Sequence, residues 1–167
     1  MRREGNSEFQ LVKIGFMRRV PMTIRKMKIE DYDAVYSLWM SCAGMGLNNL
    51  DDSKEGVSKF IQRNPETCLV AIIDSFIIGV IMVGNDGRRG YIYHIAVYPE
   101  YRKQGIAKLL VDAAMKELSD LGINKVALVV FERNKIGNAF WESQGFTVRN
   151  DLVYRNKALV KIVRIDT

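Results

Sequence analysis

Residues 94–110 read HIAVYPEYRKQGIAKLL, and this stretch decides the fold of the chain. An apolar, strand-like run ends at Tyr98 and Pro99, and a basic loop with a single glycine follows it. From Ile106 onward, apolar residues recur at helical spacing. A strand, a short basic loop and a helix in this order predict a mixed α/β domain with the loop at the start of the helix.

The start of this helix lacks the usual stabilising residues. Gln104 is no capping residue, and the first turn contains no acid. Instead, Arg102, Lys103 and Lys108 crowd the end at which the helix dipole is already positive. A bound phosphate would explain this arrangement, because free backbone N–H groups point outward there and Gly105 allows close approach. The competing interpretation is a solvated basic loop, since charge effects at helix ends are only about 0.3–1 kcal/mol.

The composition is that of one globular domain. The chain has 167 residues, of which 48% are hydrophobic and 26% are charged, and this length is sufficient to bury a core. No stretch approaches the roughly 18 apolar residues of a membrane span, so we expect a cytoplasmic protein without a membrane partner. Of the net charge of +6, residues 1–21 carry +3 from five cations and two anions. The remaining charge is too small and too dispersed to favour a nucleic-acid partner.

We divide the chain into an N-terminal extension, residues 1–21, and one domain, residues 22–167. Cys42 and Cys68 are far apart and form no C-x-x-C pair, so buried thiols are expected instead of a zinc site or a redox motif. His94 is the single histidine, which argues against a histidine-based metal site. We therefore expect no metal.

Hydrophobic periodicity predicts the remaining elements and a mixed α/β sheet in one domain. The expected helices cover residues 30–43, a segment capped by Ser53 that ends before Asn64, residues 106–121 and residues 135–144. The expected strands are residues 23–27, 67–73, 76–83, 91–97, 125–130, 146–154 and 159–165. The strand at 125–130 is a nearly continuous apolar run, which predicts burial on both faces. The long helix is expected to bury Ile106, Leu109, Leu110, Ala113, Ala114 and Leu118.

Two motifs in this order resemble those of a known family. Arg102-x-x-Gly105-x-Ala107 resembles the acetyl-CoA pyrophosphate motif of the GNAT N-acetyltransferases, and residues 134–146, NKIGNAFWESQGF, resemble the segment after that family's fifth strand. Residues 38–42 and 84–90 further resemble a bacterial subgroup of the family. The resemblance extends over most of the chain. It implies a single-domain α/β fold with a mostly antiparallel sheet flanked by helices, in which strands 4 and 5 splay apart around the CoA arm.

The resemblance also implies acetyl-CoA as co-substrate and a primary amine, on a small molecule or a protein, as acceptor. The backbone at Ile95, Ala96 and Val97 would pair with the pantetheine arm like an extra strand. The pyrophosphate would lie on the loop and the helix start, and Asn134 would touch the arm from the other side. The implied cofactor-binding residues are Ile95, Ala96, Val97, Arg102, Lys103, Gln104, Gly105, Ile106, Ala107, Lys108, Asn134 and Trp141.

The chain departs from the family at the positions that usually supply acid–base chemistry. The usual tyrosine acid is replaced by Trp141, whose indole N–H is a poor proton donor. The glutamate base that some members carry in the fifth strand is replaced by Val129. A backbone N–H at Val97 remains available to stabilise the oxyanion of the tetrahedral intermediate.

Tyr93 is our first candidate for the general acid, and His94 is the second catalytic candidate. Strand alternation predicts Tyr91 and Tyr93 on one face of the sheet and His94 on the other. A lone histidine in a strand is nevertheless more often a packed structural residue. Glu132 and Tyr154 are further candidates, and the thiolate could also leave without assistance.

The acceptor is expected between the first two helices and the C-terminal strands. Asp51, Asp52 and Glu55 could attract a cationic amine, but acids at a helix start on a solvated face are the simpler interpretation. Two other functions stay open: a non-catalytic acetyl-CoA-binding module, and a nucleic-acid-associated protein that uses Arg88 and Arg89. A homodimer is compatible with the sequence.

Overall fold

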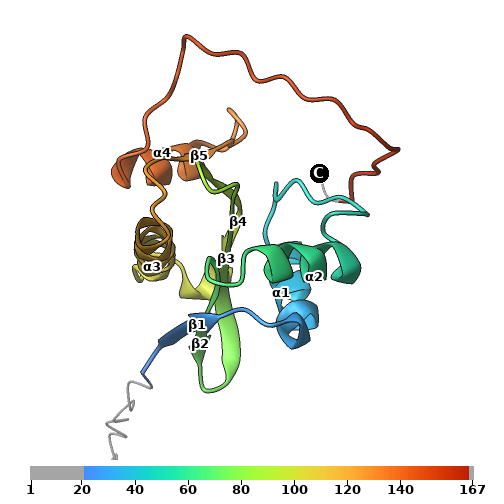
Figure 1. Cartoon of the computed structure of the whole chain (residues 1–167). Coiled ribbons are helices and arrows are strands. Elements are labelled where there is room, and N and C mark those ends of the chain that lie inside the picture. Colours follow the sequence, from blue (N-terminus) through green and yellow to red (C-terminus); the bar gives the residue numbers. More distant parts are fainter. Residues whose placement is uncertain (1–20, 166–167) are drawn as a thin grey trace, which may run out of the picture.

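A five-stranded sheet runs through the molecule, with α1 and α2 on one face and α3 and α4 on the other (Figure 1). The structure is a computed structural model that describes residues 21–165. The strands are β1 (Thr23–Lys26), β2 (Cys68–Ile73), β3 (Phe76–Asn85), β4 (Gly90–Val97) and β5 (Val126–Leu128). The helices are α1 (Tyr32–Met40), α2 (Lys54–Arg63), α3 (Ile106–Asp120) and α4 (Lys135–Ser143), with short 3-10 turns η1 (Ile29–Asp31) and η2 (Pro99–Tyr101).

The sheet has the order β1-β2-β3-β4-β5 and is antiparallel up to β4. The last pair, β4 and β5, is parallel because the chain crosses back over the sheet through α3. This architecture confirms the expected mixed α/β fold, with its mostly antiparallel sheet and flanking helices.

Alternation along β3 divides the interior into two apolar cores. Ile81 and Val83 pack with the α3 side, whereas Val80 and Met82 pack with α1 on the opposite side. Both sets are almost fully buried, so β3 is the central strand on which the two helical layers rest. The two cysteines, Cys42 and Cys68, are also buried as expected.

Local signals for the helix ends are confirmed. The Ser53 hydroxyl accepts a hydrogen bond from the Gly56 N–H at 3.1 Å and caps α2. Gly122 follows α3 with a φ of +76°, the left-handed conformation that glycine adopts most easily at a helix end. One prediction for α3 is wrong: Leu109 is 46% exposed, and Val111 takes its expected place in the core. The buried face of α3 is therefore rotated about the helix axis relative to the predicted one, away from Leu109 and toward Val111.

The fifth strand is shorter and less buried than its sequence suggests. Only Val126–Leu128 forms a ladder, and Val129 is 58% exposed. The outer edge of β5 faces no further strand in the described part of the chain. The prediction that residues 125–130 are buried on both faces is therefore wrong, because no strand or helix covers the second side of this apolar run.

The two C-terminal strands predicted at residues 146–154 and 159–165 are not formed. Between Phe146 and residue 165, the last one described, the chain contains only an isolated bridge between Asn48 and Arg164. In Figure 1 the segment arcs from α4 over the upper end of the sheet to the loop after α1. Its alternating apolar residues favoured a strand, but a strand needs a partner, and here the side chains stay exposed.

No helix between residues 21 and 165 is long and apolar enough to cross a membrane. The expected extension, residues 1–21, lies outside the described residues except for its last position. The boundary between extension and domain therefore stays a prediction.

Leu110 tests how the core supports α3. Its side chain is 0% exposed, so Leu110→Ala should lower the free energy of unfolding by about 2–5 kcal/mol. Leu109→Ala removes the same atoms from an exposed neighbour and should cost about 0.5 kcal/mol. Urea unfolding of both variants measures the difference. Equal losses would mean that α3 is rotated relative to the sheet.

Candidate functional site

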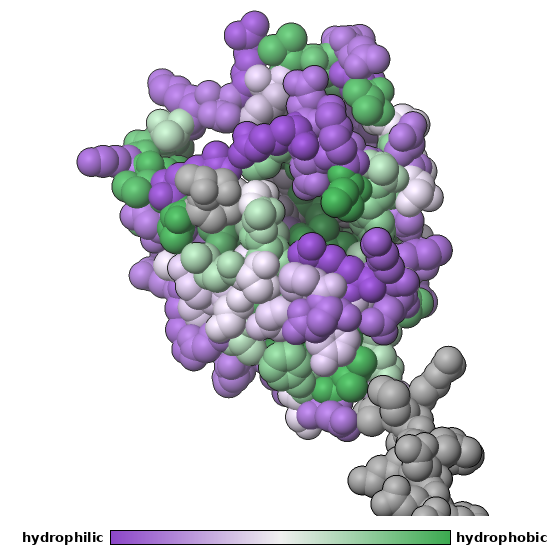
Figure 2. All heavy atoms as spheres, turned by 180° about the vertical axis from the view of Figure 1, so that it is seen from behind, coloured by the Kyte–Doolittle hydropathy of each residue, from purple (hydrophilic) through white to green (hydrophobic). Residues whose placement is uncertain are grey.

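A long groove of about 2280 Å³ runs along β4 and opens where the pairing of β4 with β5 has ended. Its walls come from the loop after α1, the start of α2, β4, the start of α3, the residues after β5, and α4. Figure 2 shows, from behind, a hollow with hydrophobic residues at its floor and hydrophilic ones around its rim. The groove is large enough for a cofactor and an acceptor together.

The groove exists because β4 and β5 stop pairing. Their ladder ends at Ile92 and Leu128, although β4 continues to Val97. The Tyr98 N–H donates to the Ile78 carbonyl of β3 at 3.0 Å, so strand alternation turns the N–H and C=O groups of Val97 and Ile95 away from β3. They face the side where β5 has already departed. The expected splay of strands 4 and 5 is confirmed, and it leaves an unpaired strand edge.

The unpaired edge leads through η2 to the start of α3, which has no side-chain cap and no acid in its first turn. Gly105 takes the N-cap position with a φ of +80°, and Lys103 is also left-handed with a φ of +60°. Left-handed non-glycine residues are uncommon and concentrate at functional sites. Lys103 and Gly105 both line the groove, and an anion site there would need the backbone N–H groups of this loop.

The basic side chains of this loop do not all point toward a ligand. Arg102 turns inward: its Nε donates to the Val97 carbonyl at 3.0 Å and its Nη2 lies 3.1 Å from the Cys42 sulfur. Lys108 forms an ion pair with Asp112 at 2.5 Å. Gln104 is the one cofactor candidate that does not line the groove. Two of the cations expected to face a ligand at the helix start, Arg102 and Lys108, are thus bonded to other groups of the protein.

Asn134 and Trp141 lie on the opposite wall, as expected, and line the groove. The Asn134 side-chain oxygen accepts from the Gly137 N–H at 2.9 Å and caps α4. Trp141 is 8% exposed and packs edge-to-face against Phe140 and Phe146, with ring centroids 5.0 and 5.1 Å apart. The indole is part of the core beside the groove, so it offers an apolar wall and no acid.

A β-bulge changes the faces of the candidate catalytic residues. Met82 pairs with His94 and Val83 pairs with Ile92, so Tyr93 is an extra residue in β4. Tyr93 and His94 consequently both point to the α1 and α2 side of the sheet. The prediction that they lie on opposite faces is wrong, because simple alternation does not hold across a bulge.

Tyr93 presents its ring to the groove. The side chain is 55% exposed, and its ring lies edge-on to Phe60 of α2, with centroids 5.1 Å apart. The Tyr91 ring lies 4.9 Å away on the same side. Burial raises the pKa of Tyr91, with smaller contributions from Tyr154 and Tyr93. Tyr93 is therefore the more accessible of the two hydroxyls.

His94 is locked in place behind Tyr93 by a buried carboxylate. Its Nε2 lies 2.7 Å from Asp52 Oδ1, and its ring packs on Trp39 of α1 with centroids 5.0 Å apart. Asp52 is 4% exposed, and its other oxygen accepts from the Asn48 N–H at 2.7 Å. The other imidazole nitrogen, Nδ1, is shielded from solvent and lacks a partner within the described residues.

The burial of Asp52 against His94 is the feature of the site that the sequence did not predict. We expected it on a solvated face with Asp51 and Glu55, and these two are indeed exposed. Asp52 instead turns inward to His94, which is 42 residues away in sequence. Asp52 lies between the helix cap Ser53 and a glycine-rich loop, and nothing in this local sequence distinguishes it as the buried acid from its neighbours Asp51 and Glu55.

Comparison with known proteins identifies the family. A family model described as the acetyltransferase (GNAT) family matches residues 32–146. The chain belongs to this family. Relatives include an acetyltransferase of Pectobacterium atrosepticum, 34% identical over 68% of this chain and 79% of its own, and one of Sodalis glossinidius, 29% identical over 84% and 97%.

Solved structures of GNAT enzymes share the fold. The PaiA N-acetyltransferase of Thermoplasma acidophilum, solved with coenzyme A, superposes with a TM-score of 0.69 at 26% identity, over 78% of this chain and 92% of its own. Ard1 of Thermoplasma volcanium reaches a TM-score of 0.70 at 20% identity, over 77% and 84%. This GNAT protein is an acetyl-CoA-dependent N-acetyltransferase that transfers an acetyl group to an amine. The alternative of a non-catalytic binding module is not favoured.

Proposed function

We propose that acetyl-CoA lies along the unpaired edge of β4, with its pyrophosphate on the start of α3, and that a primary amine of a small molecule or a protein enters from the α2 side. One observation carries this proposal: β5 leaves the edge of β4 without a strand partner at Ile95 and Val97, and this edge leads through η2 into an uncapped, acid-free helix start. The pantetheine amides would complete the missing ladder. The backbone at residues 103–108 would hold the phosphates.

The direction of the arm assigns the oxyanion donor. Val97 is nearer to the helix start, so an arm that runs from the pyrophosphate along β4 reaches Val97 first and Ile95 later. The acetyl oxygen would then accept from the Ile95 N–H, in place of the Val97 N–H considered from the sequence. Arg102 acts as a positioning residue, because its bond to the Val97 carbonyl fixes this part of the edge.

On the opposite wall, Asn134 and Trp141 would enclose the arm. The Asn134 oxygen is used by the Gly137 N–H, which leaves its side-chain N–H₂ to donate to an amide carbonyl of the arm. Trp141 would contribute apolar contact alone.

The chemistry needs one proton removed and one supplied. The bound ammonium loses a proton to water, and its lone pair then forms a bond to the thioester carbon, which yields a tetrahedral oxyanion. As the C–S bond breaks, the thiolate takes a proton from the Tyr93 hydroxyl. The nitrogen releases its second proton to water, from which Tyr93 is reprotonated. The products are the acetylated amine, CoA with a free thiol and one proton.

For His94 we propose a positioning role. His94 lines the groove, but its Nε2 is bonded to Asp52 and its Nδ1 is shielded from solvent, so neither nitrogen is placed to exchange a proton with the substrate. The His94–Asp52 pair ties the bulge of β4 to the loop before α2, and this bulge directs Tyr93 into the groove. The sequence left direct catalysis by His94 open, and the shielded ring favours this indirect role.

Three further expectations stay predictions: a cytoplasmic location, the lack of a nucleic-acid partner and a homodimer. The acyl chain is assigned as acetyl by family. A domain that spans residues 22–167 agrees with a sheet that begins at Thr23.

Ala107→Glu tests the phosphate site. Ala107 lines the groove in the first turn of α3, so a carboxylate there should repel the pyrophosphate and weaken acetyl-CoA binding about tenfold or more. Leu109→Glu adds the same charge to an exposed position outside the groove. It should change binding by no more than about fivefold, since charge effects at helix ends are about 0.3–1 kcal/mol. Calorimetric titration measures both, and equal losses would reject the site.

Tyr93→Phe removes the proposed acid. The variant should lower kcat by about 10²-fold or more and leave acetyl-CoA affinity unchanged. Tyr91→Phe removes the neighbouring hydroxyl and should retain kcat. Steady-state assays of CoA release, combined with calorimetry, separate the two quantities. Unaltered turnover in Tyr93→Phe would exclude the residue as the acid.

A double-mutant cycle tests the positioning role of the buried pair. Asp52→Asn should lower kcat roughly tenfold in the unmodified chain and have little further effect in Tyr93→Phe, because both changes act through one hydroxyl. Additive losses would show that Asp52 acts independently of Tyr93. Thermal melting confirms that each variant is folded.

A further inference from the structure

A smaller cavity opens from the acceptor half of the groove, on the far side of Tyr93. It shares Phe60, Arg63, Tyr91 and Tyr93 with the main groove, so the two spaces adjoin each other. The three aromatic rings are packed against one another and lie between the two spaces. We call the smaller space, of about 570 Å³, the side cavity.

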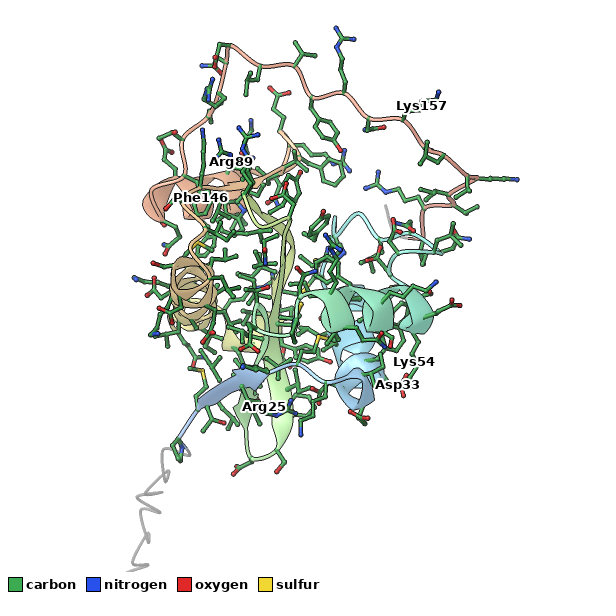
Figure 3. All side chains as sticks on the ribbon, viewed as in Figure 1. Arg25, Asp33, Lys54, Arg89, Phe146 and Lys157 are labelled. Atoms are coloured by element: carbon green, nitrogen blue, oxygen red, sulfur yellow. The ribbon has the colours of Figure 1, made fainter. Side chains whose placement is uncertain are left out.

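Three cationic side chains from different elements line the side cavity. Arg63 ends α2, Arg89 lies in the turn between β3 and β4, and Lys125 precedes β5. Figure 3 shows Arg89 at the upper end of the sheet, next to Gly90, where β4 begins and pairs with β5. Arg88, the neighbouring residue in the turn, does not line the side cavity.

The backbone holds these three cation-bearing segments together. The Asn85 N–H of the turn donates to the side-chain oxygen of Asn64, the residue after Arg63, at 3.0 Å. The Gly90 N–H, next to Arg89, donates to the Lys125 carbonyl at 2.9 Å. These hydrogen bonds therefore hold together the three segments that carry the cations, whose side chains are exposed.

Little negative charge compensates for them. Within residues 21–165, neither Arg63 nor Arg89 forms an ion pair. Asp86 is the one acid that lines the side cavity, and its Oδ1 accepts from the Arg89 and Arg88 N–H groups at 2.7 and 2.8 Å. These backbone hydrogen bonds lower the pKa of Asp86. Lys125 also interacts electrostatically with the carboxylate of Asp151, so the two arginines are the principal unpaired charges of the side cavity.

We infer that the side cavity binds an oxyanion carried by the acceptor, so that the substrate is a primary amine with a carboxylate or phosphate at its other end. Arginine guanidinium groups match the geometry of both anions and bind them through paired hydrogen bonds. The amine would pass the aromatic rings and reach the thioester, while the anion stays between Arg63 and Arg89. This inference rests on the proposed function of the groove.

The first test compares acceptors. The protein, saturated with acetyl-CoA, is assayed for CoA release with ω-amino carboxylates and ω-amino phosphates of increasing chain length, against alkylamines of equal length. Anionic amines should show kcat/KM about tenfold or more above the alkylamines. Arg89→Ala should abolish this preference by raising KM, while Arg88→Ala should retain it.

The second test needs no turnover. Inorganic phosphate is titrated into protein saturated with CoA, which occupies the pyrophosphate site, and binding is followed by NMR shifts of backbone amides. Shifts in residues 84–90 that Arg89→Ala removes and Arg88→Ala keeps would support the side cavity. If phosphate causes no such shifts, or if both variants lose them equally, the inference is overturned. It is also overturned if the enzyme acetylates alkylamines with the same kcat/KM as the anionic amines.

Different results would contradict the proposed acetyl-CoA site and the proposed anion site in the side cavity. If the unmodified chain does not bind acetyl-CoA, the proposed groove assignment is wrong. If acetyl-CoA binds and neither phosphate nor anionic amines depend on Arg89, only the inference about the side cavity is wrong. Acetyl-CoA affinity measured in both arginine variants provides the control, because neither residue belongs to the cofactor wall.

Discussion

The parting of β4 from β5 is the constraint on which the functional part of the structure depends. From Gly90 to Ile92 the two strands pair and continue the sheet, whereas beyond Ile92 β4 runs on without β5 to Val97. Backbone N–H and C=O groups are obligatory hydrogen-bonding groups, so an unpaired strand edge beside a groove is a site for an extended, amide-bearing ligand. The start of α3, without a side-chain cap or an acid in its first turn, lies at the end of the same edge and is the proposed anion site. Together they match the two chemical parts of acetyl-CoA.

A second irregularity in β4 places the proposed acid, Tyr93, and the residue proposed to position it, His94. The bulge at Tyr93 brings two consecutive residues to one face of the sheet, where an unbroken strand would separate them. Tyr93 reaches the groove, and His94 turns into the protein to meet Asp52. A buried carboxylate that is hydrogen-bonded on both oxygens is a stable support for such a bend. In this account the family's missing tyrosine at Trp141 is replaced from a different element of the fold.

The elements of the fold were predictable wherever local physics decides them. Ser53 as a cap, Gly122 as a helix terminator and the periodicity of α3 each depend on neighbours within a few residues. Predictions failed where a distant partner decides the outcome. Residues 146–165 have the alternation of strands but no partner strand beside them, and residues 125–130 are apolar but only half covered. Leu109 was misplaced because a helix face can rotate slightly without changing its period.

The sequence by itself indicated an α/β protein that resembles the GNAT family and predicted a phosphate-binding turn at residues 102–108, because the spacing of glycine and cations around a helix start is a local property. Only the tertiary structure decided that Arg102 turns to Val97 and Cys42, that Asp52 is buried against His94, and that Arg63, Arg89 and Lys125 converge. Each of these contacts joins segments distant along the chain. The energy that orients such side chains comes from packing and hydrogen bonds across the fold, for which a local pattern carries no signal.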